Sequence, residues 1–148
     1  MTEVSFHFNV PDKLRHACLL LRKAHQSGRP MGVVGPPAEL QALDTALWEV
    51  SAPDFIPHCS SDAPAQVLAQ TSIVLAPDCS AIEHSHMLLQ LGSEVPAGFE
   101  RFERLIEIVG LDAPDRQQAR RRWRYYADRG YAMKRWDASA AAGSRRKA

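Results

Sequence analysis

The sequence predicts an α/β fold, a single domain with a mostly parallel sheet flanked by helices. Short apolar runs alternate along the chain with stretches of helical periodicity. Proline and glycine stand where such helices would begin and end. At 148 residues with 45% apolar side chains, the chain is long enough to bury one conventional core without disulfides or metal.

The first half of the chain is interpreted as strand, helix, strand, helix. Residues 4–10 alternate apolar and polar side chains, as a half-buried strand does, and residues 11–28 carry a helical stripe that ends in Gly28. Residues 31–34 form a short apolar strand. A second helix is predicted over residues 36–48, and it begins at the two prolines of residues 36 and 37. This order predicts βαβ units, which join parallel strands.

The second half is less regular. Residues 51–70 contain three prolines and are interpreted mostly as loop. A helix is predicted from Asp112 to Gly130, with a proline in its first turn. Three further apolar runs predict buried strands, at residues 72–76, 86–91 and 104–109. We expect the domain to span residues 1–136 and residues 137–148, rich in Ala and Ser with a basic end, to form a disordered tail.

No motif for a bound nucleotide or for catalysis is present. The turn at residues 32–37 lacks the G-x-G-x-x-G and phosphate-loop spacings, and its two prolines have no N–H to offer a phosphate. Cys79, His84 and His86 are zinc-ligand residue types, yet their spacing fits no zinc pattern. No G-x-S-x-G elbow occurs. We therefore expect no catalytic, cofactor or metal site.

Cysteine count and apolar runs indicate the compartment. Three widely spaced cysteines argue against a disulfide framework and for a reducing environment. The sequence shows no export signal and no apolar run of membrane-spanning length. We expect a cytoplasmic protein with no membrane contact.

The charge is divided between the two parts of the chain. Residues 1–100 carry 5 Lys/Arg against 11 Asp/Glu, a net of −6, and residues 101–148 carry 13 against 6, a net of +7. The C-terminal part is thus suited to an acidic partner. A nucleic acid, an anionic membrane, an acidic peptide and a merely solvated basic face would all satisfy this asymmetry.

The C-terminal helix arranges its cations around one aromatic ring. At about 100° per residue, one stripe roughly 100° wide holds Arg116, Arg120, Trp123, Arg124 and Ala127. An apolar notch rimmed by guanidinium groups suits an acidic peptide with a terminal carboxylate. A solvated face around a core tryptophan and direct nucleic-acid binding are the alternatives. Trp48, followed by Phe55 and Ile56, is a second aromatic candidate, either as a lid on the core or as a docking patch.

Taken together, several motifs resemble the chi subunit family of the bacterial DNA polymerase III holoenzyme, over most of the chain up to Tyr131. They are Leu43-Asp44-x-x-Leu47-Trp48, Phe55-Ile56-Pro57-His58, Glu94-Val95-Pro96, Phe99-x-x-Phe102-x-Arg104, Ile106-Glu107-Ile108-Val109, Ala119-Arg120-x-Arg122-Trp123-x-x-Tyr126 and Gly130-Tyr131. The resemblance implies a fold like that of mononucleotide-binding proteins without a working nucleotide site.

The resemblance further implies a non-catalytic adaptor, a monomer or part of a heterodimer. Such an adaptor joins the clamp loader, through the psi subunit, to the acidic C-terminal tail of single-stranded DNA-binding protein, and meets DNA mainly indirectly. Trp48 and Phe55 would face psi. Carried over by position, the surface that binds the tail would consist of Val109, Arg116, Arg120, Trp123 and Arg124. A module that binds single-stranded nucleic acid directly through its Arg-rich helix is the alternative function.

Overall fold

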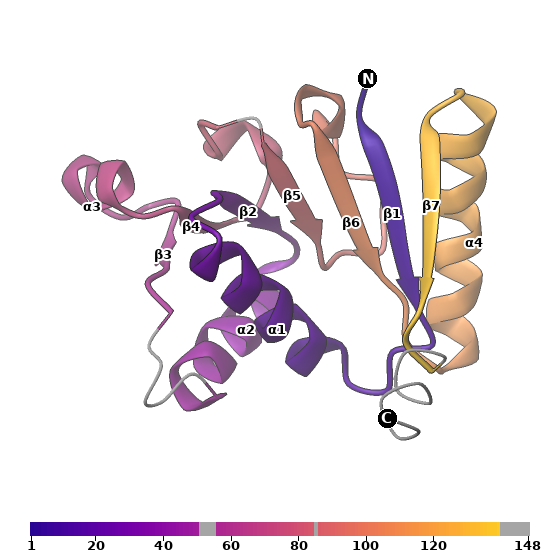
Figure 1. Cartoon of the computed structure of the whole chain (residues 1–148), viewed down its shortest axis with the longest axis horizontal. Coiled ribbons are helices and arrows are strands. Elements are labelled where there is room, and N and C mark those ends of the chain that lie inside the picture. Colours follow the sequence, from indigo (N-terminus) through magenta and orange to yellow (C-terminus); the bar gives the residue numbers. More distant parts are fainter. Residues whose placement is uncertain (51–55, 85, 140–148) are drawn as a thin grey trace.

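The computed structural model describes residues 1–50, 56–84 and 86–139 (Figure 1). Seven strands form one sheet, in the order β3-β4-β2-β5-β6-β1-β7, and every strand pair is parallel. The strands are β1 (Glu3–Phe8), β2 (Met31–Val34), β3 (Cys59–Ser60), β4 (Ile73–Ala76), β5 (Met87–Gln90), β6 (Arg104–Ile108) and β7 (Ala132–Asp137). The predicted parallel α/β fold is confirmed.

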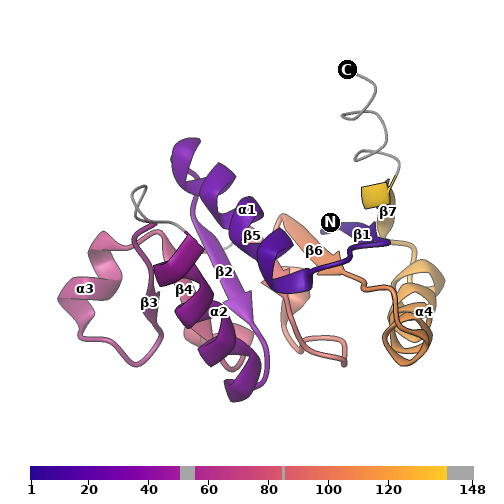
Figure 2. The ribbon, with the colours of Figure 1, turned by 90° about the horizontal axis from the view of Figure 1, so that it is seen from below.

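Helices cover both faces of this sheet. The α-helices are α1 (Lys13–Gln26), α2 (Pro37–Val50), α3 (Ala65–Gln70) and α4 (Ala113–Asp128), and two 3-10 turns are η1 (Cys79–Ala81) and η2 (Phe99–Arg101). One apolar cluster joins the sheet to α1 and α2, and a second joins the opposite face to η1, η2 and α4. Figure 2 shows α1 and α4 on opposite sides of the sheet.

The predicted elements with clear apolar periodicity are present. The strands predicted at 4–10, 31–34, 72–76, 86–91 and 104–109 correspond to β1, β2, β4, β5 and β6, within one or two residues at most ends. The three predicted helices correspond to α1, α2 and α4. Asp12 and Asp112 cap α1 and α4 by accepting hydrogen bonds from the N–H groups of Arg15 and Asp115.

Three elements differ from the prediction. The stretch interpreted as loop, residues 51–70, contains β3 and α3, although residues 51–55 lie outside the described residues. The sequence pattern did not predict β7, which adds a strand beside β1 and extends to Asp137. Most of its residues are exposed, because it is the last strand of the sheet. The expected tail lies outside the described residues from residue 140 onward.

Candidate functional site

A cavity of about 450 Å³ lies between α4 and the strands β1 and β7; we call it the α4 pocket. Its lining combines apolar rings with cations and includes no acidic residue. The residues are Phe6, Phe8, Asn9, Val109, Arg116, Ala119, Arg120, Trp123 and Arg135. They come from β1 and the residue after it, the end of β6, α4 and β7.

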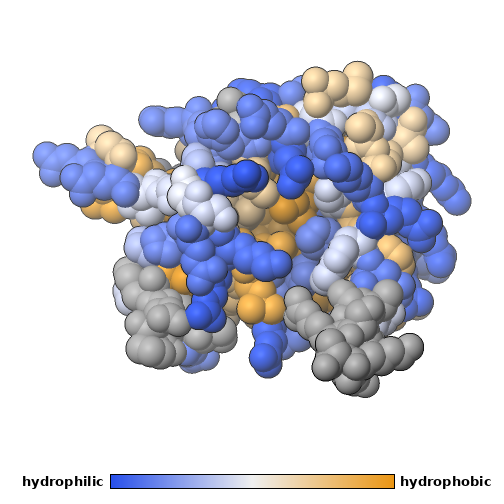
Figure 3. Space-filling model, viewed as in Figure 1, coloured by the Kyte–Doolittle hydropathy of each residue, from blue (hydrophilic) through white to orange (hydrophobic). Residues whose placement is uncertain are grey.

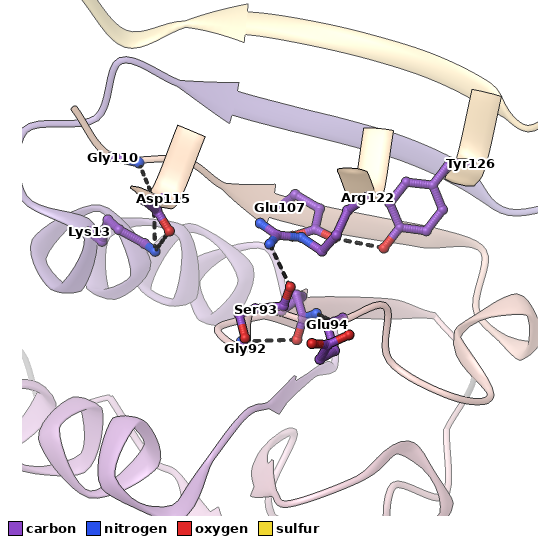
Figure 4. A network of polar contacts seen from close by, with 10 residues as sticks. Lys13, Gly92, Ser93, Glu94, Glu107, Gly110, Asp115, Arg122 and Tyr126 are labelled. Carbon is purple, nitrogen blue, oxygen red and sulfur yellow. Dashed lines mark hydrogen bonds and ion pairs between the residues drawn. The ribbon is translucent and has the colours of Figure 1, made fainter. Parts of the chain in front are cut away.

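A buried polar network sets the orientation of α4 against the sheet (Figure 4). Glu107 of β6 is fully buried and accepts hydrogen bonds from Arg122 Nε at 3.0 Å and from the Tyr126 hydroxyl at 2.7 Å. Arg122 also donates to the carbonyl of Ser93 at 2.9 Å. Because Arg122 and Tyr126 face inward, the neighbouring helix face that holds Arg116, Arg120 and Trp123 is turned toward the pocket.

Burial shifts the proton equilibria of this network. Loss of water around Glu107 raises its pKa from 4.5 to about 7, against the opposing effects of the Arg122 charge and the Tyr126 hydrogen bond. Burial and the neighbouring carboxylate raise the pKa of Tyr126, which keeps its hydroxyl a donor. The network therefore fixes the helix, and the free energy needed to bury Glu107 depends on pH because its charge does.

The first turn of α4 is anchored separately. Asp115 accepts a hydrogen bond from the N–H of Gly110 at 2.7 Å and forms an ion pair with Lys13 of α1 at 3.1 Å. Figure 4 shows these two contacts at one end of the helix and the Glu107 network farther along. Two attachment points along the helix fix both its position and its rotation, so the pocket is preformed.

The apolar floor of the pocket is built around Trp123, which is partly buried. Its indole meets the ring of Phe6 edge to face, with centroids 5.1 Å apart. The buried Val109 and Ala119 complete the floor. An open, ring-lined floor of this kind can accept one aromatic or aliphatic side chain.

Three arginines line the pocket together with this floor. The guanidinium of Arg135 lies 5.0 Å from the ring centre of Phe8 and 5.9 Å from that of Trp123. Arg116 donates to Asn9 Oδ1 at 2.8 Å, and Arg120 is exposed. The pocket can therefore bind a ligand that carries an apolar end and several carboxylates.

Asn9 lines one side of the pocket, and its backbone adopts a conformation that few residue types tolerate. Its φ of 58° lies in the left-handed region, which asparagine tolerates better than most residues. The side-chain amide donates to Asp137 at 3.1 Å while its oxygen accepts from Arg116. Asn9 thus joins the end of β1 to β7 and to α4.

The structure brings together four of the five residues expected to bind the tail. Val109, Arg116, Arg120 and Trp123 all line the α4 pocket. Arg124 is exposed and is not among the lining residues, because the predicted stripe is wider than the helix face that meets the pocket.

Of the remaining lining residues, Ala119 lies on α4, whereas Phe6, Phe8, Asn9 and Arg135 come from β1, the residue after it and β7. Helical spacing did not indicate these last four. The alternation of residues 4–10 could have indicated Phe6 and Phe8, which share one face of that strand. Nothing in the sequence pattern indicated Arg135, because its strand was not predicted.

The second predicted surface is partly described. Trp48 is 57% exposed and does not cover the core, whereas Ile56 of the same predicted patch is buried in the core cluster under α1 and α2. Its indole lies 5.6 Å from the ring of His58, which is held between the carbonyl of Ile56 and the carboxylate of Asp44 at 2.8 and 2.9 Å. Phe55 lies outside the described residues.

Two further features concern the described residues only. Within residues 1–50, 56–84 and 86–139, no three His, Cys, Asp or Glu side chains are grouped so that they could hold a metal ion. In the same part of the chain, no helix is both long and apolar enough to cross a membrane.

Comparison with known proteins gives the family. The model of the family described as "DNA polymerase III chi subunit, HolC" matches residues 1–134. The chain belongs to the chi subunit family. The DNA polymerase III subunit chi of Pseudomonas aeruginosa is 29% identical to this chi-family chain over 139 residues, which cover 90% of this chain and 94% of the relative. Family membership supports an accessory role in DNA replication within the polymerase III complex.

Proposed function

We propose that this chi-family chain is a non-catalytic adaptor of the bacterial replisome. It links the clamp loader, through the psi subunit, to the acidic C-terminal tail of single-stranded DNA-binding protein. The observation that carries this proposal is the α4 pocket, an apolar floor surrounded by guanidinium groups with no acidic residue in its lining.

The pocket suggests how such a tail is held. Its terminal aromatic side chain packs on Trp123 and Val109, and its C-terminal carboxylate pairs with Arg120 or with Arg135 across the floor. Acidic side chains farther from the terminus meet Arg116, which Asn9 already orients. Arg124, outside the lining, contributes long-range attraction rather than a fixed contact.

This mode of binding sets the expected strength. One short peptide on a shallow, preformed site should bind in the micromolar range, about −8 kcal/mol. Several tails on one coating protein would raise the effective affinity by rebinding. Exposed ion pairs are screened by salt, so affinity should fall as salt rises.

The test is fluorescence anisotropy with a labelled acidic peptide that ends in Phe. Trp123→Ala removes the floor and Arg120→Glu reverses a rim charge, and each should weaken binding at least about tenfold, since a central anchor of an interface is worth about 2 kcal/mol or more. Arg121→Glu is the matched control, because Arg121 is exposed on the same helix outside the pocket and the charge change is the same. Amidation of the peptide's terminal carboxylate should weaken binding to the wild-type protein as well.

Two results would contradict the proposal. Unchanged binding in Trp123→Ala and Arg120→Glu would exclude the α4 pocket as the tail site. Equal losses in Arg120→Glu and Arg121→Glu would mean that only the overall charge of α4 matters, as the alternative of a generally basic helix requires.

The psi surface is proposed to include Trp48 and Phe55. An indole that is 57% exposed, beside a His58 held by Asp44, is a suitable anchor for a partner. Trp48→Ala should abolish co-purification of psi while peptide binding at the α4 pocket persists. Retention of psi by Trp48→Ala would exclude Trp48 from that interface.

A further inference from the structure

A second cavity, of about 570 Å³, lies between α1 and the strands β1 and β7; we call it the α1–β7 cleft. It is on the opposite face of the sheet from the α4 pocket. Side chains alternate along a strand, so Phe6 and Arg135 face α4 while His7, Lys134 and Trp136 face α1. The lining residues are Ser5, His7, His16, Leu19, Leu20, Arg22, Lys23, Gln26, Lys134, Arg135 and Trp136.

An aromatic platform occupies one end of the cleft. The indole of Trp136 is stacked on the ring of His16, with centroids 5.4 Å apart and planes at 27°, and remains 38% exposed. His7 lies 5.1 Å from the same indole, and its Nδ1 is 2.8 Å from His16 Nε2. Burial lowers the pKa of His7 to about 4 and also lowers the pKa of His16, so the two rings are neutral near pH 7. They support the indole without adding charge.

Cations from two elements line the cleft next to this platform. Arg22 and Lys23 come from α1, and Lys134 comes from β7. Lys134 also pairs with Glu3 at 3.4 Å, and its side chain is 65% exposed. The lining includes no acidic residue, so the cleft presents a flat ring system next to positive charges.

We propose that the α1–β7 cleft binds single-stranded nucleic acid, with one base stacked on Trp136 and the adjacent phosphates on Lys23 and Lys134. A single strand alternates flat bases with negative phosphates, which matches a ring platform next to cations. An acidic peptide with an aromatic end would use the same cations and ring, and its binding here is one outcome of the test below. This site is separate from the α4 helix, and it does not rest on the proposed binding of the acidic tail.

The experiment is an anisotropy titration of the full chain with a labelled oligothymidine at low salt. Non-specific binding of this kind has a dissociation constant of roughly 10⁻⁴ to 10⁻⁶ M at physiological salt and is tighter at low salt. Trp136→Ala should weaken binding about tenfold, since stacking of one base on an aromatic ring is worth about 1–3 kcal/mol. Lys23→Glu should weaken it and reduce the salt slope by about 0.7, the value for one phosphate on a single strand.

Controls separate stacking from general attraction. Trp48→Ala removes another exposed indole, and Arg121→Glu makes a comparable charge change away from the cleft; neither should alter the dissociation constant by more than about twofold. An abasic oligonucleotide of equal length and charge should bind the wild-type protein about tenfold more weakly. This comparison needs no variant, so a folding defect in Trp136→Ala would not obscure it.

Further outcomes decide the proposal. Saturation of the α4 pocket with acidic peptide, or the substitution Trp123→Ala, should leave oligothymidine binding unchanged, which separates this proposal from the proposed function. Equal binding of the abasic strand, or equal losses in Lys23→Glu and Arg121→Glu, would overturn it. Weaker binding of the acidic peptide to Trp136→Ala, with oligothymidine binding unchanged, would assign the cleft to a peptide instead.

Discussion

Glu107 should make the stability of the protein depend on pH in a way that one substitution removes. The carboxyl is fully buried between Arg122 and Tyr126, and burial raises its pKa from 4.5 to about 7. A carboxyl whose pKa is raised in the folded state stabilises the fold when protonated, and that contribution is lost as pH rises through the folded pKa. Between pH 5 and pH 8, this shift corresponds to roughly 2–3 kcal/mol, lost on going to the higher pH.

The histidines act in the opposite direction over the same range. The pKa of His7 is lowered to about 4, so the neutral ring favours the folded state and that stability is lost as pH falls below 6.5. The pKa values of His16 and His84 are lowered as well. A pH profile of the wild-type protein alone therefore cannot isolate Glu107.

The substitution Glu107→Gln isolates it, because glutamine keeps an acceptor for Arg122 and a polar group for Tyr126 but does not titrate. Urea unfolding at pH 5 and pH 8 gives the free-energy difference between wild type and Glu107→Gln at each pH. That difference should favour the wild type by roughly 2–3 kcal/mol more at pH 5 than at pH 8. Glu49→Gln, at an exposed glutamate of α2, is the control and should follow the wild-type profile. Parallel profiles for wild type and Glu107→Gln would mean that Glu107 stays ionised beside Arg122 throughout.

Two predictions concern the fold around the sites. Gly32→Ala should lower the free energy of unfolding by about 1–3 kcal/mol, because an added Cβ would stand 2.5 Å from Cδ1 of the buried Ile82; an unchanged urea midpoint would show that Ile82 has room to move. Asp112→Ala should cost about 1 kcal/mol by removing the cap of α4, whereas Asp112→Asn should retain most of it. Equal midpoints for Asp112→Ala and wild type would show that the cap contributes nothing measurable.

The sequence pattern predicted the strands and helices that bury a regular set of apolar side chains. It did not predict a strand that is defined only by its hydrogen bonds to a neighbouring strand. Strands such as β2 and β4 are buried along their whole length and appear as apolar runs. In β7, Met133 and Trp136 fall on opposite faces and most positions are exposed, so no period of two is visible. Its strand conformation comes from hydrogen bonds to β1, which the local sequence does not encode.

The residues of the candidate site likewise fall into a predicted group on the helix and an unpredicted group on the strands. Helical spacing alone placed Arg116, Arg120 and Trp123 together, since residues on one helix have fixed relative positions. The partners across the floor, Phe8 and Arg135, depend on β1 lying between β6 and β7 in the sheet. Strand order follows from long-range packing, so the opposite side of the pocket could not be derived from spacing along the chain.

The pair of strands β1 and β7 would allow one small domain to hold both proposed ligands at once. Alternate residues of each strand face opposite sides of the sheet, so Phe6 and Arg135 contribute to the α4 pocket while His7 and Trp136 contribute to the α1–β7 cleft. The sheet lies between the two cavities, whose linings share Arg135 of the edge strand β7, and neither proposed ligand needs to displace the other. An adaptor of this kind would hold an acidic tail on one face of the sheet and the neighbouring single strand on the other. Because the tail belongs to the protein that coats this strand, binding at one site would raise the effective concentration of the ligand at the other.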